Sequence, residues 1–282
     1  MQIQRGMAAF VSGAGSGIGR GIALQLAARG VSVGVVDIRL DDAQETVALI
    51  EAQGGRALAV QADVSDAASV DAAADAVEAA LGPVRIACNN AGVAMHGVPL
   101  HDIALKDWDW VIGVNVYGVI HGIRTFVPRM LAQGVPCHIV NTASIGGFQV
   151  NPTFLTAAYS MTKYAAVALS EGLQQELATS AVGVSVLAPA AVDTGIHLSA
   201  RARPDRLGGA YERPENHFMG DLIKDGMKPD QIGHMVVTAI EAGDFYIFPH
   251  PDTWHWLAAR HDRIREGFDR SIAGFGPPKA AE

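Results

Sequence analysis

The sequence is poor in cysteine and in positive charge. Cys88 and Cys137 are the two cysteines among 282 residues, and nothing marks them as a pair. So few thiols argue against a disulfide framework and are typical of a chain kept in a reducing compartment. The 21 lysines and arginines are outnumbered by 29 aspartates and glutamates, which gives a net charge of −8. This balance argues against nucleic-acid binding, because that function needs a basic face.

Long apolar runs, internal repeats and metal-ligand spacings are missing as well. No stretch of about 18 apolar residues occurs, and the N-terminus has no basic region followed by an apolar one. The ten histidines show no spacing typical of a metal site. We therefore expect a cytoplasmic protein that binds no metal ion and does not enter a membrane.

What the sequence does contain is a regular alternation of short apolar runs and segments with helical periodicity. The apolar runs predict strands at 7–12, 32–37, 57–61, 85–89, 138–142, 183–188 and 245–248. Helices are expected at 17–29, 41–53, 66–81 with Ser65 as N-cap, 106–133, 157–178, 229–242 and 251–268. This order predicts an α/β fold, a doubly wound Rossmann-type parallel sheet of about seven strands with helices on both faces.

We expect a single domain, because α/β folds of this length are usually single. Residues 7–192 form the expected cofactor-binding core, 193–228 a substrate lid, and 251–282 a C-terminal helix and tail. The lid segment breaks the alternation and contains Pro204, Pro214 and Gly208-Gly209. An irregular stretch of this length inside a compact domain is usually functional or disordered.

A glycine-rich loop joins the first expected strand to the first expected helix, with the pattern Gly13-x-x-x-Gly17-x-Gly19. Glycines permit a tight turn there and let backbone N–H groups approach a pyrophosphate at the N-terminus of the helix. Asp37 ends the second expected strand, where a carboxylate can bind both ribose hydroxyls of adenosine and repel a 2′-phosphate. These features predict NAD as the cofactor. Arg39 is the one contrary sign, because it could swing toward a phosphate.

The second candidate site is the pair Tyr159 and Lys163. They are four residues apart in an expected helix, so both side chains lie on one face, one turn apart. A phenol ordinarily titrates near pH 10, and a neighbouring ammonium group favours the phenolate. The pair by itself is common on amphipathic helices. Together with the glycine loop it predicts acid/base chemistry coupled to hydride transfer.

These motifs resemble those of the short-chain dehydrogenase/reductase family, in its single-domain branch. The matching stretches follow the family's order between residue 7 and about residue 250: 12–19, Asp63-Val64, 89–92, Asn115, Ser144, Tyr159 with Lys163, and 189–194. The resemblance implies an NAD(P)-dependent alcohol dehydrogenase or ketone reductase.

The resemblance also implies a role for each matching residue. Tyr159 would exchange the proton of the alcohol or ketone, and Ser144 would hydrogen-bond the same oxygen. Lys163 would bind the nicotinamide ribose and lower the tyrosine pKa, and Asn115 would help to hold a water that relays protons. The residues implied to contact the cofactor are Gly13, Ser16, Gly17, Ile18, Gly19, Asp37, Asp63, Val64, Asn90, Ala91, Gly92, Tyr159, Lys163, Pro189, Val192 and Thr194.

Two positions depart from the family's pattern. Ser144 precedes Tyr159 by two residues more than is usual, and Thr142 is the alternative hydroxyl. Ala190 stands where the family usually has glycine after Pro189, and an alanine there is strained if the backbone requires a positive φ. The geometry beside the nicotinamide therefore depends on the fold of these two segments.

We therefore expect an NAD-dependent oxidoreductase of a secondary alcohol or ketone. Apolar residues in the lid and in the loop after Ser144, among them Phe148, Phe154 and Phe218, predict a bulky apolar or aromatic substrate. Residues 107–115, 125–130 and 245–251 resemble a narrower group that includes the bacterial Cα-dehydrogenases of lignin-type aryl ethers. Arginines 201, 203, 206 and 213 of the lid alternate with acidic residues and are expected on a solvated surface, and His96, His197 and His217 in loops or at the surface.

Two alternatives remain at this point. An NADPH-dependent 3-ketoacyl-type reductase is opposed by Asp37 and by Ser16, where NADP-using relatives commonly carry a basic residue. A catalytically silent cofactor-sensing protein is opposed by the intact tyrosine–lysine pair. We also expect a homotetramer, with a homodimer as the alternative. The candidates for its apolar interface, which fit the core of a single chain equally well, are Phe126, Val127, Met130, Val167 and Leu173.

Overall fold

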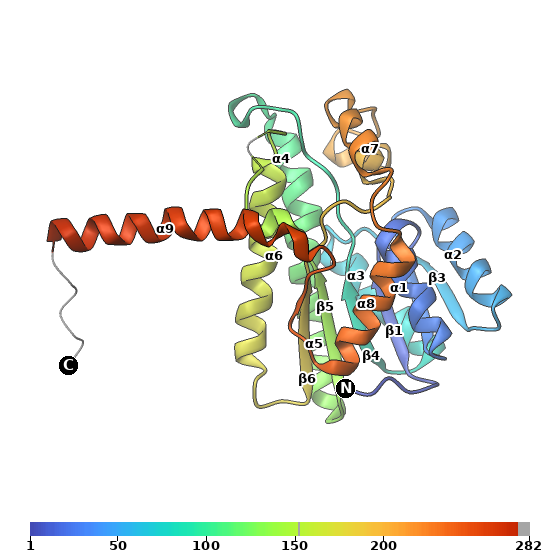
Figure 1. The fold of residues 1–282 in the computed structure, drawn as a ribbon. Helices are drawn as coiled ribbons and strands as arrows, with labels where there is room; N and C mark the ends of the chain where they lie inside the picture. Colours follow the sequence, from blue (N-terminus) through green and yellow to red (C-terminus); the bar gives the residue numbers. More distant parts are fainter. Residues whose placement is uncertain (152, 276–282) are drawn as a thin grey trace. The chain divides into compact units, whose positions relative to one another are not determined.

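The protein was analysed as a computed structural model, which describes residues 1–151 and 153–275. Seven parallel strands form one sheet in the order β3-β2-β1-β4-β5-β6-β7 (Figure 1). Their bounds are β1 Ala8–Ser12, β2 Ser32–Asp37, β3 Ala57–Gln61, β4 Val84–Asn89, β5 Cys137–Thr142, β6 Val182–Leu187 and β7 Tyr246–Ile247. The chain order reverses between β1 and β4, and ligands of such sheets bind at the carboxyl ends of the strands beside this point. The predicted doubly wound parallel sheet is confirmed.

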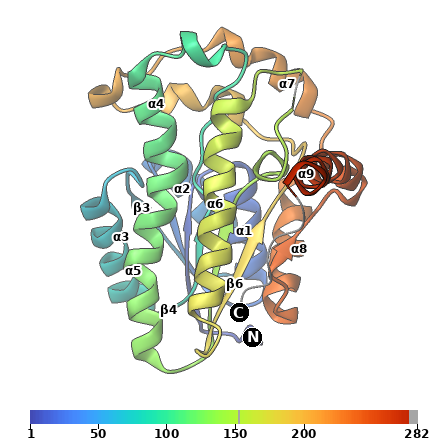
Figure 2. The same ribbon diagram turned by 90° about the vertical axis from the view of Figure 1, so that its left-hand side faces the viewer.

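Helices cover both faces of the sheet. One face carries α1 Gly17–Ala28, α2 Leu40–Ala52 and α8 Pro229–Ala242. The other carries α3 Ala67–Leu81, α5 Gly118–Gln133 and α6 Ala157–Glu176 (Figure 2). Neighbouring strand residues point to opposite sides, so Ala9 and Val11 join the first core while Ala8 and Phe10 join the second. Burial on both faces explains why the strands appear in the sequence as continuous apolar runs.

Some boundaries differ from the prediction. The N-cap of α3 is Asp66, whose carboxylate accepts a hydrogen bond from Ala68 N at 3.0 Å. Ser65 is bound instead to the carboxylate of Asp63. The long helix expected over 106–133 is α4 Leu105–Ile112, a π-helical turn Gly113–Tyr117, and α5. Pro128 lies inside α5 without ending it.

That long helical stretch, Leu105–Gln133, is the one part of the described chain whose length and composition would allow it to cross a membrane. It is weak evidence for a span, because 44% of its most apolar window is buried within the protein. Phe126 and Met130 of α5 are fully buried in the core that covers the sheet. Val167 and Leu173 of α6 are also buried. The prediction that these four residues form an exposed surface for a second subunit was wrong, because their side chains already belong to the core of their own chain.

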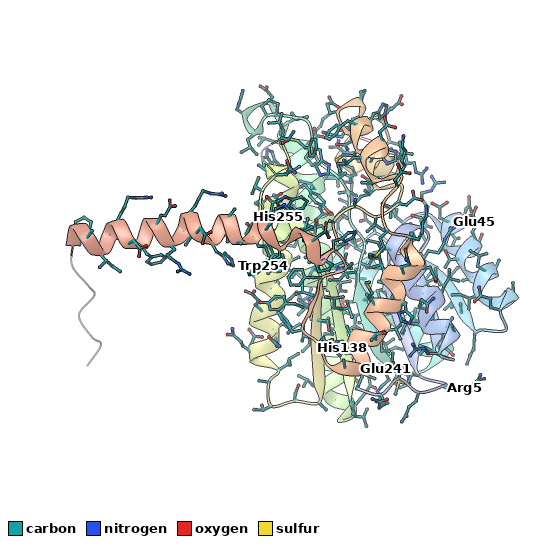
Figure 3. The ribbon with its side chains drawn as sticks, viewed as in Figure 1. Arg5, Glu45, His138, Glu241, Trp254 and His255 are labelled. Atoms are coloured by element: carbon teal, nitrogen blue, oxygen red, sulfur yellow. The ribbon has the colours of Figure 1, made fainter. Side chains whose placement is uncertain are left out.

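Two compact units divide the chain, Met1–Pro249 and His250–Glu282. In the first, the segment between β6 and α8 holds the short helices Ile196–Ala202, Asp205–Leu207 and Pro214–Asn216, followed by α7 His217–Ile223. The second unit contains the turn Pro251–Thr253 and α9 Trp254–Phe275, which begins later and ends later than expected. Trp254 and His255 at its start are exposed (Figure 3). Most of the expected tail, 276–282, lies outside the described residues.

Candidate active site

The loop after β1 is shaped by glycines that no other residue could replace without moving its neighbours. Gly13 and Gly17 have φ values of 63° and 51°, in the region that favours glycine. A Cβ on Gly19 would lie 2.2 Å from the carbonyl oxygen of Gly13. Ser16 precedes α1 as its N-cap without using its side chain as a cap, and the first turn of α1 holds no acidic residue. Its free N–H groups suit an anion such as a pyrophosphate.

Asp37, at the end of β2, lies directly beside this loop. Its Oδ2 accepts a hydrogen bond from Gly15 N at 2.9 Å, and its Oδ1 accepts one from Arg39 N at 3.1 Å. Burial raises the pKa of this carboxyl, and the hydrogen bonds from Arg39 and Gly15 oppose that rise. The Arg39 guanidinium pairs with Asp42 at 2.8 Å. The argument that Arg39 could bind the 2′-phosphate of NADP is therefore weaker, because this guanidinium already has a carboxylate partner.

The ends of β3 and β4 complete the cofactor side. Asn90 donates from its side chain to Ser12 O at 3.0 Å, and the backbone N–H groups of Asn90 and Ala91 both donate to Ser12 Oγ. The Val64 carbonyl accepts from His121. Asp63 binds Arg206 of the lid through its second carboxylate oxygen. Ile18 packs against the core below the glycine loop.

Ser144 stands two residues beyond β5 and begins the short helix Ile145–Gly147. Its Oγ accepts from Gly146 N at 3.1 Å, donates to Pro189 O at 3.3 Å, and hydrogen-bonds the Tyr159 hydroxyl. The two extra residues therefore lie in the loop between this helix and α6. The Thr142 hydroxyl, the alternative, donates instead to Asn90 Oδ1 at 3.2 Å.

Burial dominates the electrostatics of the tyrosine–lysine pair. It raises the pKa of Tyr159 to about 12, and the hydrogen bond with Ser144 opposes this. It lowers the pKa of Lys163 to about 8. Lys163 is 3% exposed, donates from Nζ to Thr142 O at 3.0 Å, and lies 5.6 Å from the centre of the Tyr159 ring. In the protein alone, burial therefore outweighs the lowering of the Tyr159 pKa that was expected from Lys163. Tyr159 is protonated at neutral pH.

Asn115 lies in the π-helical turn between α4 and α5. Its Oδ1 accepts from Val93 N at 2.8 Å, and its Nδ2 donates to Val93 O and Thr162 Oγ1, each at 3.0 Å. A Cβ on Gly92 would lie 3.3 Å from Lys163 Nζ and 3.4 Å from Asn115 Oδ1, so Gly92 stands between these two groups. Turns of this kind inside helices are frequent at functional sites.

The segment after β6 holds further residues that were expected to contact the cofactor. Thr194 lies beside the glycine loop, since a Cβ on Gly17 would meet its Cγ2 at 3.1 Å. Val192 is buried at 4% exposure. Ala190 does not need a positive φ; among the described residues Leu155, with φ of 46°, is the non-glycine residue that has one. The strain considered for Ala190 is therefore absent.

Two lid arginines at the substrate end were wrongly expected on a solvated surface. Arg203 and Arg213 of the lid are 3% and 5% exposed, and both bind Asp107 of α4. His96 is 4% exposed, and its ring lies 4.9 Å from the Tyr159 ring. Their burial depends on the packing of the lid over α4. No periodicity in the local sequence reveals that packing.

The residues present fit a dinucleotide: glycines with positive φ that form a tight turn, a helix N-terminus without acidic residues, and a carboxylate at the end of β2. Comparison with known proteins agrees, because the family model described as short chain dehydrogenase matches residues 7–205. The chain belongs to the short-chain dehydrogenases.

Among the relatives of this short-chain dehydrogenase is a "C alpha-dehydrogenase" of Sphingobium sp. strain SYK-6, 35% identical over 266 residues, which cover 93% of this chain and 83% of that protein. A solved short-chain dehydrogenase of Burkholderia phymatum, in complex with NAD, has a TM-score of 0.90 and 36% identity over 95% of this chain and 97% of its own. Another, of Burkholderia cenocepacia, in complex with NADP, has a TM-score of 0.72 and 30% identity over 88% of this chain and 96% of its own.

Proposed function

We propose that this short-chain dehydrogenase transfers hydride between a secondary alcohol, or the corresponding ketone, and NAD. The observation that carries the proposal is the joint placement of Ser144, Tyr159 and Lys163. The Tyr159 hydroxyl hydrogen-bonds Ser144, and the Lys163 ammonium is buried one turn further along the same helix. Asn115 Oδ1 lies beside Gly92, as Lys163 Nζ does.

Each of these groups has a definite task in the proposed reaction. When bound, the nicotinamide supplies the hydride acceptor for oxidation or the hydride donor for reduction. Tyr159 Oη takes the alcohol proton in oxidation and returns it to the ketone oxygen in reduction. The Ser144 hydroxyl donates a hydrogen bond to the same oxygen and stabilises the charge that develops there. In this proposal Lys163 holds the nicotinamide ribose, and Asn115 helps to hold the water that relays protons.

The preference for NAD over NADP is part of the proposal and rests on the charges around Asp37. The carboxylate lies against Gly15 N, Arg39 is paired with Asp42, and Ser16 carries no charge. A 2′-phosphate would meet a carboxylate and no free guanidinium from Arg39. The Burkholderia phymatum relative bound to NAD supports this choice, whereas the Burkholderia cenocepacia relative bound to NADP requires that both cofactors be tested.

We also propose a bulky apolar or aromatic substrate. Tyr159 belongs to an apolar cluster with Val93, Met95 and Trp110. Phe154 of the loop before α6 contacts Phe218 of the lid, with ring centres 5.3 Å apart. The name of the Cα-dehydrogenase relative supports oxidation at a Cα carbon. Apolar walls with a few placed polar groups are usual for ligands of this size.

The test of the reaction is Tyr159→Phe, which removes the proton-transfer group and keeps the ring. We expect kcat to fall by about 10²–10⁴-fold, while the affinity for NAD changes little. Turnover is followed by the absorbance of the reduced nicotinamide, and NAD binding by calorimetry. Tyr246→Phe is the control, since Tyr246 is exposed and its hydroxyl binds Glu171 away from the site. Retention of more than a tenth of kcat in Tyr159→Phe contradicts the proposal.

A cytoplasmic homotetramer, with a homodimer as the alternative, completes the proposed function. The four core residues named above cannot form its interface. Exposed apolar side chains remain on the stretch formed by α4, the π-helical turn and α5, at Leu105, Tyr117 and Leu131. Light scattering at micromolar protein concentration measures the assembly, and a monomer there contradicts this part of the proposal.

A further inference from the structure

Two neighbouring buried polar side chains each have a nitrogen without a hydrogen-bond partner, and one of the two lies against Tyr159. The ring of His96 lies 4.9 Å from that of Tyr159, and its Nδ1 has no hydrogen-bond partner. Asn216 of the lid has no exposed surface, and its Nδ2 also has no partner. The Oδ1 of the same carboxamide accepts from His96 N at 3.1 Å. The carboxamide is therefore anchored to the backbone of His96, so the two residues that carry the unpaired nitrogens are neighbours.

These nitrogens are part of a wider pattern. In the described chain, the buried side-chain atoms without a partner belong to His96, His197, Arg203 and Asn216. All four residues lie in the loop after β4 or in the lid, and none lies in the sheet or its covering helices. Native proteins leave few such atoms, because each one lowers the free energy of unfolding. Their gathering at one end of the protein indicates groups reserved for a ligand.

The chemistry of the two nitrogens restricts that ligand. Burial, with the nearby positive charge of Arg213, lowers the pKa of His96 to about 4, so its imidazole is neutral at neutral pH. Arg213 itself is occupied by Asp107, by the Tyr211 hydroxyl and by Met95 Sδ. A neutral imidazole nitrogen and an amide N–H together match a hydroxyl group, which can both donate and accept. A purely apolar group would leave both nitrogens unpaired.

We propose that His96 and Asn216 bind a second hydroxyl group of the substrate, so that a hydroxylated secondary alcohol is preferred over the alcohol that lacks this group. The inference rests on the proposed function and names its substrate class more closely. His96 is then a specificity-determining residue. Its ring contact with Tyr159 places the second hydroxyl beside the carbon that is oxidised.

The experiment compares kcat/KM of the wild-type protein within two matched pairs of benzylic alcohols. Phenylethylene glycol is paired with α-ethylbenzyl alcohol, and the glycol's one-carbon-longer homologue with α-propylbenzyl alcohol. In each pair a hydroxyl replaces a methyl group of similar size. A hydrogen bond of about 1.4 kcal/mol corresponds to a tenfold difference. We therefore expect at least one diol to be preferred by about tenfold or more.

The variant His96→Phe keeps an aromatic ring against Tyr159 and keeps the backbone N–H that holds Asn216, but removes Nδ1. We expect its diol preference to fall to about one, mainly through a higher KM for the diol. A residue with only a structural role would reduce both members of a pair equally. His101→Phe is the matched control, because the His101 side chain is 83% exposed, and we expect it to keep the wild-type preference.

The outcomes separate the two proposals. Oxidation of both members of each pair at equal kcat/KM by the wild-type protein overturns the inference, assigns the two nitrogens to bound water and leaves the proposed function intact. Oxidation of none of the four alcohols, with either NAD or NADP, overturns the proposed function and the inference with it. A wild-type preference that His96→Phe leaves unchanged also overturns the inference. The wild-type comparison decides even if the variant does not fold.

Discussion

The contact between α1 and α8 leaves no room for a single methyl group. A Cβ on Gly21 of α1 would lie 2.1 Å from the carbonyl oxygen of Pro229 and 2.5 Å from its carbonyl carbon. A Cβ on Gly233 of α8 would lie 2.2 Å from the carbonyl oxygen of Gly21. Both contacts are with backbone, which cannot rotate aside as a side chain can. We therefore expect Gly21→Ala to force α1 and α8 apart by about an ångström.

The magnitude follows from two opposing contributions. Overpacking against backbone costs about 3 kcal/mol, the upper end of the usual range. Alanine is favoured over glycine inside a helix by about 1 kcal/mol. The net loss of unfolding free energy is then about 2 kcal/mol, and at about 2–4 °C per kcal/mol it lowers Tm by about 4–8 °C. The glycine loop precedes α1 directly, so NAD affinity is expected to fall as well.

The assay is thermal unfolding followed by circular dichroism, with NAD titration of the same samples. Gly172→Ala is the matched control, because a Cβ on Gly172 of α6 would meet nothing within 4 Å. That variant is expected to gain about 0.5–1 kcal/mol from helix propensity alone. A Gly21→Ala protein that melts at or above the wild-type temperature would refute the reasoning. So would a Gly172→Ala protein that is destabilised as much.

Two further predictions concern charge. Asp37→Ala is expected to narrow the preference for NAD, because it removes the ribose acceptor and the repulsion of a 2′-phosphate; kcat/KM with both cofactors measures this, and equal values in the wild type contradict it. Burial lowers the pKa of His96 and His138 from 6.5 to about 4, so between these pH values the unfolded chain binds protons that the folded chain does not. The unfolding free energy should fall as pH falls through this window, by about 1.4 kcal/mol per pH unit for each histidine. Urea unfolding at several pH values in this window measures how steeply the unfolding free energy depends on pH. In His138→Gln this dependence should correspond to one proton fewer than in the wild type, and the glutamine can keep a hydrogen bond to Ser185.

The sheet and the glycine loop could be predicted because each depends on local chemistry. Strands buried on both faces need continuous apolar runs, and the turn at Gly13 and Gly17 needs residues that tolerate a positive φ. Tyr159 and Lys163 were singled out by their helical spacing together with the glycine loop. Asn115 was found by resemblance, but its π-helical turn was not, because residue spacing does not distinguish such a turn from the α-helix around it.

The remainder depended on contacts between distant segments. Ser65 and Asp66 are both good N-caps, and the choice between them depends on Asp63, which binds Ser65. From the sequence alone, an apolar helix residue such as Phe126 fits a core position and a subunit interface equally well. The burial of Arg203 and Arg213 requires Asp107, about a hundred residues earlier in the chain. No local pattern contains that information.

The packing of α1 on α8 has a consequence for how the protein is made. A ribosome releases α1 about two hundred residues before the surface of α8 that covers it. At a synthesis rate of about 5–20 residues per second, Ile22 and Leu26 lack the cover of α8 for about ten to forty seconds. During that time the nascent chain exposes an apolar helix face, and a chaperone that recognises such faces has its longest opportunity there.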